Sequence, residues 1–128
     1  MDTDYINDEE ILYRAILNKM PNAIVNGKVS AAAFIDNSGG TSVDRDGGRT
    51  KDEITETFRK RFNRNGKEDI YLASASLTAR QCRSASACPM PCASRKNAFH
   101  AEIHESATEE CLSLAKAILM SRMCTLHA

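Results

Sequence analysis

Apolar and polar positions alternate most regularly between residues 97 and 106. Side chains of a β-strand point in turn to its two faces, so this period of two predicts a strand with one face against a core. We therefore expect two histidines and a carboxylate to share a polar face. The apolar face would contain Phe99, Ala101 and Ile103, and the polar face His100, Glu102 and His104.

Three stretches have apolar residues at helical spacing, and each begins with a signal for a helix start. Asn7 is a good N-cap residue, and the three acidic residues after it favour the positive end of a helix dipole. Thr50 and Glu53 have the spacing of a capping box, and Thr108 precedes two glutamates. The predicted helices cover about residues 8–20, 50–64 and 108–123.

Turn signals separate the remaining apolar stretches. The pair Asn26-Gly27 between apolar residues is the strongest short signal for a β-hairpin, because both residue types tolerate positive φ. Residues 82–96 are rich in Ser, Cys, Pro and Arg without periodicity, which predicts a loop or an irregular edge. The predicted strands cover about residues 23–25, 28–35, 41–45, 70–80 and 97–106.

These elements predict an α+β fold in which a small, mainly antiparallel sheet packs against three helices. The last helix is apolar over a wide arc, so we expect this C-terminal helix to cover one face of the sheet. A chain of 128 residues has the length of one ordinary domain. We therefore expect a single domain over residues 1–128.

Charge and cysteine content limit the classes of partner. The 17 basic and 17 acidic residues cancel, so the net charge does not indicate binding to nucleic acid. The first ten residues are acidic rather than basic and apolar, and no apolar run approaches the roughly 20 residues of a membrane span. Five cysteines without a repeating framework are typical of reduced thiols. We expect a cytoplasmic protein without a membrane partner.

Three blocks of the chain resemble short motifs in a loose set of small bacterial and phage proteins of unknown function. They are V-S-x-x-A-F at residues 29–34, S-V-D at residues 42–44 and N-x-x-H-A at residues 97–101. The order of the blocks is also similar, with Leu-Tyr-Arg at residues 12–14 ahead of them. The resemblance implies that the blocks belong to one domain, and it implies no catalytic residue.

The polar face of the His-rich strand contains residue types that can bind a metal ion. Side chains two residues apart on a strand can reach one ion, which offers the pairs His100/Glu102 and Glu102/His104. His100 and His104 are about 13 Å apart at the standard rise per residue, too far to bind the same ion without a bulge. We therefore predict neither a metal nor another cofactor, and metal-assisted chemistry at His100/Glu102 stays open as an alternative.

A zinc site from Cys82, Cys88, Cys92 and His100 is a further alternative. Three thiolates and one imidazole are a known zinc ligand set. Structural zinc sites usually contain closely spaced C-x2-C pairs, and the sequence has none here. Reduced cysteines in a loop are therefore the favoured interpretation.

A glycine-rich turn at residues 46–49 leads into the predicted helix start, where unpaired N–H groups favour an anion. Arginines flank this turn, and a guanidinium binds phosphate through two hydrogen bonds. If residues 41–45 lie beside the His-rich strand, the polar residues of both would form one cationic pocket. The candidate ligand-binding residues are Ser42, Arg45, Arg49, His100, Glu102 and His104. The alternative is that the acidic residues of the turn neutralise its arginines on the surface.

These residues suggest three functions from different classes. The first is a binding module for a small phosphorylated or nucleotide-like anionic ligand. The second is a hydrolase or nuclease that uses a histidine as general base, so whether the protein is an enzyme stays open. The third is a homo-oligomeric interaction protein whose last helix forms a homodimer.

Overall fold

The computed structural model describes residues 5–62 and 69–128. Its sheet has six strands in the order β6-β7-β4-β1-β5-β8, and every neighbouring pair is antiparallel. A separate two-stranded hairpin pairs β2 with β3. The elements are β1 (Ile11–Leu17), β2 (Ile24–Val25), β3 (Lys28–Val29), the 3-10 helix η1 (Ala31–Phe34), β4 (Thr41–Arg45), α1 (Lys51–Phe62), β5 (Tyr71–Thr78), α2 (Ala79–Ser84), β6 (Cys88–Pro91), β7 (His100–His104), α3 (Leu114–Met123) and β8 (Thr125–His127).

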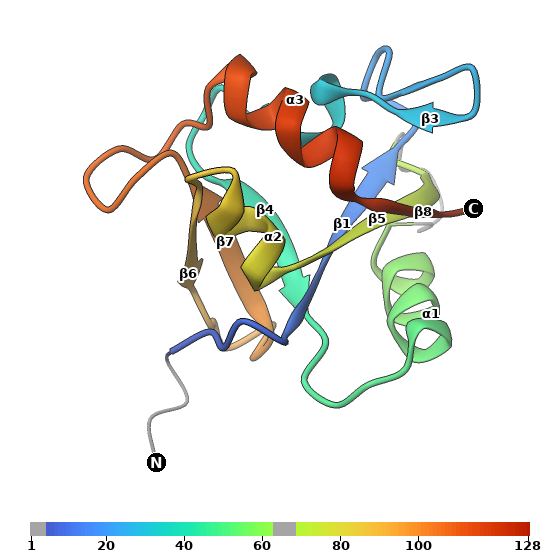
Figure 1. Ribbon diagram of the computed structural model, residues 1–128. Helices are drawn as coiled ribbons and strands as arrows, with labels where there is room; N and C mark the ends of the chain where they lie inside the picture. The colour runs from blue at the N-terminus through green and yellow to red at the C-terminus, as the bar shows by residue number, and fades with distance from the viewer. Residues whose placement is uncertain (1–4, 63–68) are drawn as a thin grey trace.

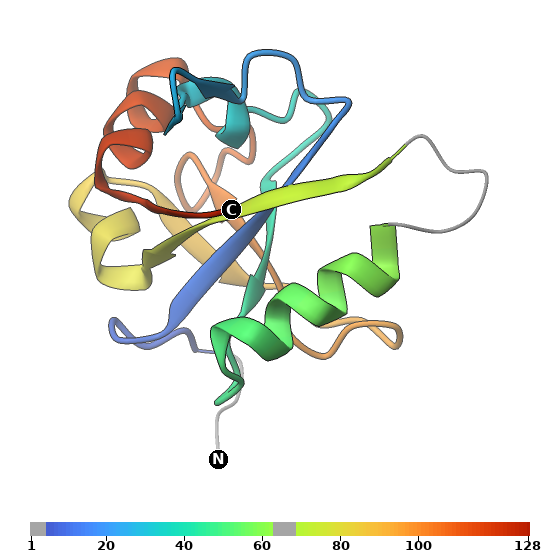
Figure 2. The same cartoon turned by 90° about the vertical axis from the view of Figure 1, so that its right-hand side faces the viewer.

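Helices cover both faces of the sheet, which confirms the predicted α+β class. The C-terminal helix α3 lies on one face together with α2 and η1, and α1 lies on the other face (Figures 1 and 2). The core under α3 is the larger one and includes Phe34, Ile103 and Met120. The smaller core under α1 includes Ile54 and Phe58. No helix in the described residues is both long enough and apolar enough to cross a membrane.

The predicted helix over residues 8–20 is wrong, because this stretch forms the central strand β1. Residues 12–17 are all buried, and their apolar side chains are divided between the two cores. A continuous apolar run that is buried on both sides has no polar face, so its periodicity does not distinguish a strand from a buried helix. The capping signal instead forms a turn, in which the Asn7 N–H donates to Glu10 Oε2 at 2.8 Å.

The Asn26-Gly27 hairpin is confirmed, and both residues have positive φ. The strand predicted over residues 28–35 ends at Val29, because η1 occupies Ala31–Phe34. The strand predicted over residues 41–45 is confirmed as β4.

The capping box at the start of α1 is confirmed. The Thr50 N–H donates to Glu53 Oε1 at 2.9 Å, and the Glu53 N–H donates to Thr50 Oγ1 at 3.2 Å. This exchange satisfies two of the backbone N–H groups that a helix start leaves unpaired. The end of the helix predicted over residues 50–64 lies outside the described residues, which stop at Phe62 before the gap.

The segment between residues 70 and 96 is more regular than its composition indicates. The predicted strand is confirmed as β5 but ends at Thr78, where a second capping box with Gln81 starts α2. The predicted loop over residues 82–96 contains the second half of α2 and the whole of β6. Both prolines of β6 lie on an edge strand, where a missing N–H breaks no interior ladder.

The strand predicted over residues 97–106 is shorter, since β7 covers His100–His104, and its predicted orientation is confirmed within these bounds. Phe99, predicted on the buried face, instead lies in the turn before β7, half-buried under the Arg49 guanidinium and outside both cores. Ala101 and Ile103 are fully buried, and the three polar residues between and beside them are half-buried on the opposite face. The last helix starts at Leu114 rather than at residue 108, because Ser113 provides the N-cap and accepts from the Lys116 N–H. Its buried residues are Ala117 and Met120.

Candidate functional site

The polar sides of β4 and β7 form one continuous surface. The register places Ser42 opposite Glu102 and Asp44 opposite His100. Residues opposite each other in an antiparallel pair share a face, so these four side chains are neighbours. The sequence predicted a shared polar surface only if these two strands were adjacent. They are adjacent in the sheet.

A pocket of about 570 Å³ lies where this surface meets α1, which crosses one face of the sheet in Figure 2. Small-ligand sites usually have volumes of about 300–1,000 Å³. Ser42 and His100, two of the predicted site residues, line this pocket. Its aromatic lining residues are Tyr13, Phe58 and Phe62, and its charged lining residues are Arg14, Lys19, Asp36, Asp44, Arg61 and Lys96.

The inner wall of the pocket lies where β1 and β4 separate. The two strands pair only at Leu12 with Arg45 and at Tyr13 with Asp44, and they diverge towards the top of Figure 1. The Arg14 guanidinium lies at this divergence, where its Nε donates to the carbonyl of Ala33 at 2.9 Å and its Nη1 donates to the carbonyl of Ser42 at 3.0 Å. Its Nη2 has no acceptor among the described residues.

Arg14 is a buried cation of the pocket. The residue is only 8 % exposed, and it forms no ion pair with any residue of 5–62 or 69–128. Burial lowers the pKa of the Arg14 guanidinium, and the negative charge of Asp36 acts in the opposite direction. Because arginine ordinarily titrates far above neutrality, the group stays charged. A buried charge without a carboxylate partner is costly, and an anionic ligand in the pocket would compensate that cost.

Asp44 fixes the second cation of the pocket. Its side chain is 2 % exposed, and its two oxygens accept from Arg61 Nη1 and Nη2 at 3.1 and 3.3 Å. Arg49 Nη2 lies 3.4 Å from Oδ2, and Asn97 Nδ2 donates to Oδ1 at 3.0 Å. One buried carboxylate therefore positions α1, the turn after β4 and the loop before β7 around the pocket.

The two arginines that the sequence suggested as anion ligands lie outside the pocket lining. Arg45 follows Asp44 on β4 and therefore points to the other face, where it donates to both Glu10 oxygens at 2.8 and 2.9 Å. Arg49 donates to the carbonyls of Arg45 and Asp46, and its guanidinium stacks 3.9 Å from the centre of the Phe99 ring. Both guanidinium groups thus have partners within the fold.

The three polar residues of β7 divide between two surroundings. Glu102 lies between the histidines, with Oε1 at 2.8 Å from His104 Nε2 and Oε2 at 3.9 Å from His100 Nε2. His100 lines the pocket, whereas Glu102 and His104 lie beyond it, beside the loop before β4.

The four residues of the cysteine zinc alternative do not form one site. Cys82 is completely buried in the core under α3, and this burial raises the pKa of its thiol to about 12. Cys88 is the register partner of His104, so its side chain lies on the sheet face that carries His100. This face is opposite to the core that contains Cys82. A thiolate at Cys82 therefore cannot reach an ion bound at His100, because the sheet separates them.

Sequence reasoning missed the residues that give the pocket its charge. The sequence predicts helices around Arg14 and Arg61 and a loop around Lys96, and it assigns none of the three residues to a site. A lone arginine inside the apolar run of residues 11–17 was the available signal, since charged residues are rarely buried without a partner.

Comparison of the chain with protein-family models, with curated proteins and with solved structures finds no match.

Proposed function

We propose that this protein is a binding module for a small phosphorylated, nucleotide-like ligand, held in the pocket between α1 and the polar surface of β4 and β7. The observation that carries the proposal is Arg14, a buried residue that lines the pocket and has no ion-pair partner among the described residues. A phosphate or carboxylate accepts from a guanidinium in a favourable planar geometry.

Further charges of the pocket support an anionic ligand. Lys96 is exposed on the loop before β7 and has no ion pair in the described part of the chain. Arg61 and Arg49 both form an ion pair with the Asp44 carboxylate. Two positive groups thus face one negative group, and their sum is a net positive charge. The acidic residues of the pocket are fewer than its basic ones, which gives a local cationic site in a chain of zero net charge.

Aromatic rings of the pocket support a ligand with a planar ring. Phe58 and Phe62 of α1 line it, and their ring centres are 6.2 Å apart. Tyr13 of β1 lines the same pocket from the sheet. Aromatic side chains stack on nucleobases without strong sequence preference, with about 1–3 kcal/mol for each base. A nucleoside monophosphate has a base that can stack on aromatic rings and a phosphate that can bind cations. The pocket offers both kinds of group.

The proposal is tested by calorimetric titration with AMP and with adenosine. We expect AMP to bind and adenosine to bind at least tenfold more weakly, a difference of about 1.4 kcal/mol, because adenosine lacks the phosphate. Arg61→Gln should weaken AMP binding by about tenfold. Equal affinity for the two compounds, or no binding of AMP up to about 1 mM, would contradict the proposal.

Arg59→Gln is the matched control for the Arg61 variant. Arg59 lies on the same helix two residues earlier, is exposed and does not line the pocket. The two variants remove the same charge from the protein. We therefore expect Arg59→Gln to retain the affinity of the wild type, which separates a specific contact from a general loss of positive charge.

A further inference from the structure

A second cluster of titratable side chains lies beyond the pocket, at the end of β7. Glu102 and His104 belong to the strand, and Glu110 comes from the loop that leads to α3. One possible ligand atom from each of the three residues lies within 4.8 Å of the other two. The strand supplies two donors at a spacing of two residues, and the returning loop supplies the third, which a strand alone could not provide.

Gly40 makes room for this cluster. A Cβ at this position would lie 2.7 Å from His104 Nε2 and 2.8 Å from Glu102 Oε1. Gly39 is also close, since a Cβ there would lie 3.6 Å from Glu110 Oε1. Any side chain at residue 40 would therefore displace two of the three donors, so the loop before β4 leaves open the space that the donors face.

The charges of the cluster are unbalanced. Glu102 forms ion pairs only with histidines among the described residues, and the Glu110 carboxylate has no hydrogen bond or ion pair in that part of the chain. The same two negative charges act on the Cys92 thiol. Burial, and after it the charges of Glu102 and Glu110, raise the pKa of this thiol. The Glu102 and Glu110 carboxylates repel each other and have neither a lysine nor an arginine partner among the described residues, and a bound cation would remove this repulsion.

We infer that Glu102, His104 and Glu110 form a binding site for one divalent transition-metal ion of the zinc class. Imidazole nitrogen and carboxylate oxygen are ordinary zinc donors at about 2.0–2.2 Å, which places tetrahedral ligand atoms about 3.4 Å apart. One possible ligand atom from each of the three residues already lies within 4.8 Å of the other two, and Glu110 is exposed, so its side chain can adjust towards this spacing. Hard cations such as Mg²⁺ prefer all-oxygen ligands, so the imidazole favours a transition metal.

Three protein ligands leave one tetrahedral position open for water. This site does not depend on the anion pocket, because neither Glu102 nor His104 lines that pocket. The two are adjacent, since Ser42 of the pocket lies opposite Glu102 in the sheet.

Calorimetric titration of the chelator-treated full chain with Zn²⁺ tests this inference. We expect one ion to bind per chain, with affinity at least tenfold lower in His104→Ala and in Glu110→Gln. Glu110→Gln keeps the test valid if His104→Ala fails to fold, since Glu110 is exposed and its carboxylate has no hydrogen bond or ion pair among the described residues. Full zinc affinity in folded Glu110→Gln would overturn the inference, since it would assign the ion to cysteines or to other groups. Failure of the wild type to bind Zn²⁺ at micromolar concentration would overturn it as well.

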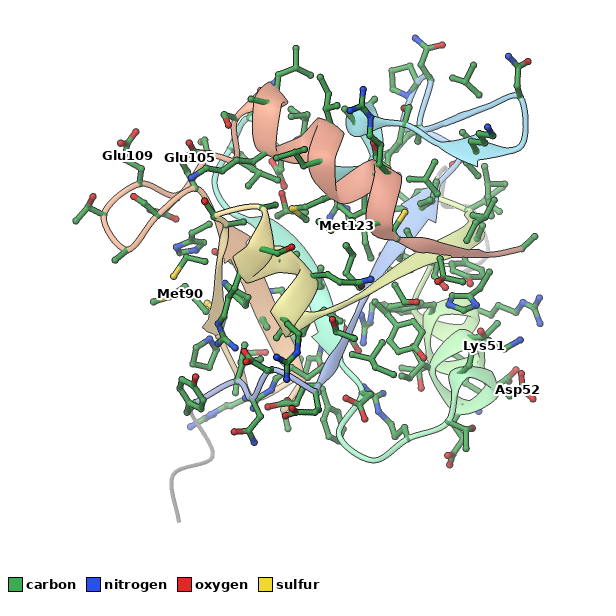
Figure 3. All side chains as sticks on the ribbon, in the orientation of Figure 1. Lys51, Asp52, Met90, Glu105, Glu109 and Met123 are labelled. Atoms are coloured by element: carbon green, nitrogen blue, oxygen red, sulfur yellow. The ribbon has the colours of Figure 1, made fainter. Side chains whose placement is uncertain are left out.

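Glu109→Gln is the matched control for Glu110→Gln. Glu109 precedes Glu110 on the same loop, and its side chain points away from the sheet (Figure 3). Glu105 is less suitable, because it accepts from the Ser113 N–H at 2.8 Å and forms an ion pair with Lys116. We expect Glu109→Gln to bind Zn²⁺ as the wild type does, and an equal loss in both variants would overturn the inference by showing a non-specific charge effect.

Discussion

Single buried polar residues determine how the loops of this protein lie against its sheet. Asp44 accepts from Arg61 and from Asn97, and Arg49 lies beside the same carboxylate, so one side chain of β4 connects a helix, a turn and a loop. Arg14 has the opposite arrangement, since it donates to two carbonyls and has no described carboxylate partner. The pocket thus combines a buried carboxylate that has several partners with a buried cation that forms no ion pair among the described residues.

His127 on β8 makes the stability of the fold dependent on pH. Its Nε2 lies 2.8 Å from Ser76 Oγ, and burial, with a further contribution from the charge of Lys51, lowers the pKa of the imidazole below 6.5. The unfolded chain then binds the proton more readily, so stability falls as the pH decreases through about 6.5 and towards the folded-state pKa. In thermal unfolding at about pH 7.5 and 5.5, the midpoint of the wild type should fall more than that of His127→Gln. Equal falls in the two proteins would show that His127 does not contribute.

At the scale of elements, β7 could be predicted from the sequence and β1 could not. β7 has one buried and one half-buried face, so its residues alternate in polarity and fix both its type and its orientation. β1 lies in the middle of the sheet between two cores, and its apolar residues leave no alternation to detect. The start of α3 was placed too early because Thr108 resembles a cap, whereas Ser113 is the residue that accepts from the helix N–H.

The orientation of β7 leads to opposite expectations for two neighbouring residues. Ile103 is completely buried in the core under α3, so Ile103→Ala should cost about 2–4 kcal/mol through lost burial and a cavity. His104 lies on the half-buried face, so His104→Ala should cost less than about 1 kcal/mol. Denaturant unfolding of both variants measures the two free energies. A severe loss in His104→Ala with a tolerated Ile103→Ala would mean that the two faces are exchanged.

At the scale of the whole molecule, the candidate site is assembled from segments far apart in the chain. Ser42 and His100 could be proposed from sequence, because the polarity of their strands suggested a shared surface. Arg14, Arg61 and Lys96 could not, since their approach depends on the divergence of β1 from β4 and on the packing of α1 across the sheet. Glu110 likewise approaches β7 only through the path of a loop that carries no periodic signal.

If Arg14 receives the anionic group of a ligand, as proposed above, the NMR resonance of its own Nε–H group reports on this directly. That N–H donates to the carbonyl of Ala33 inside the fold, which protects it from exchange with solvent. Its absence from the spectrum of Arg14→Lys would assign it. We expect the resonance to shift to saturation as AMP is added and to stay near its free position with adenosine. A resonance that does not move with AMP, or that moves equally with both compounds, would contradict the account.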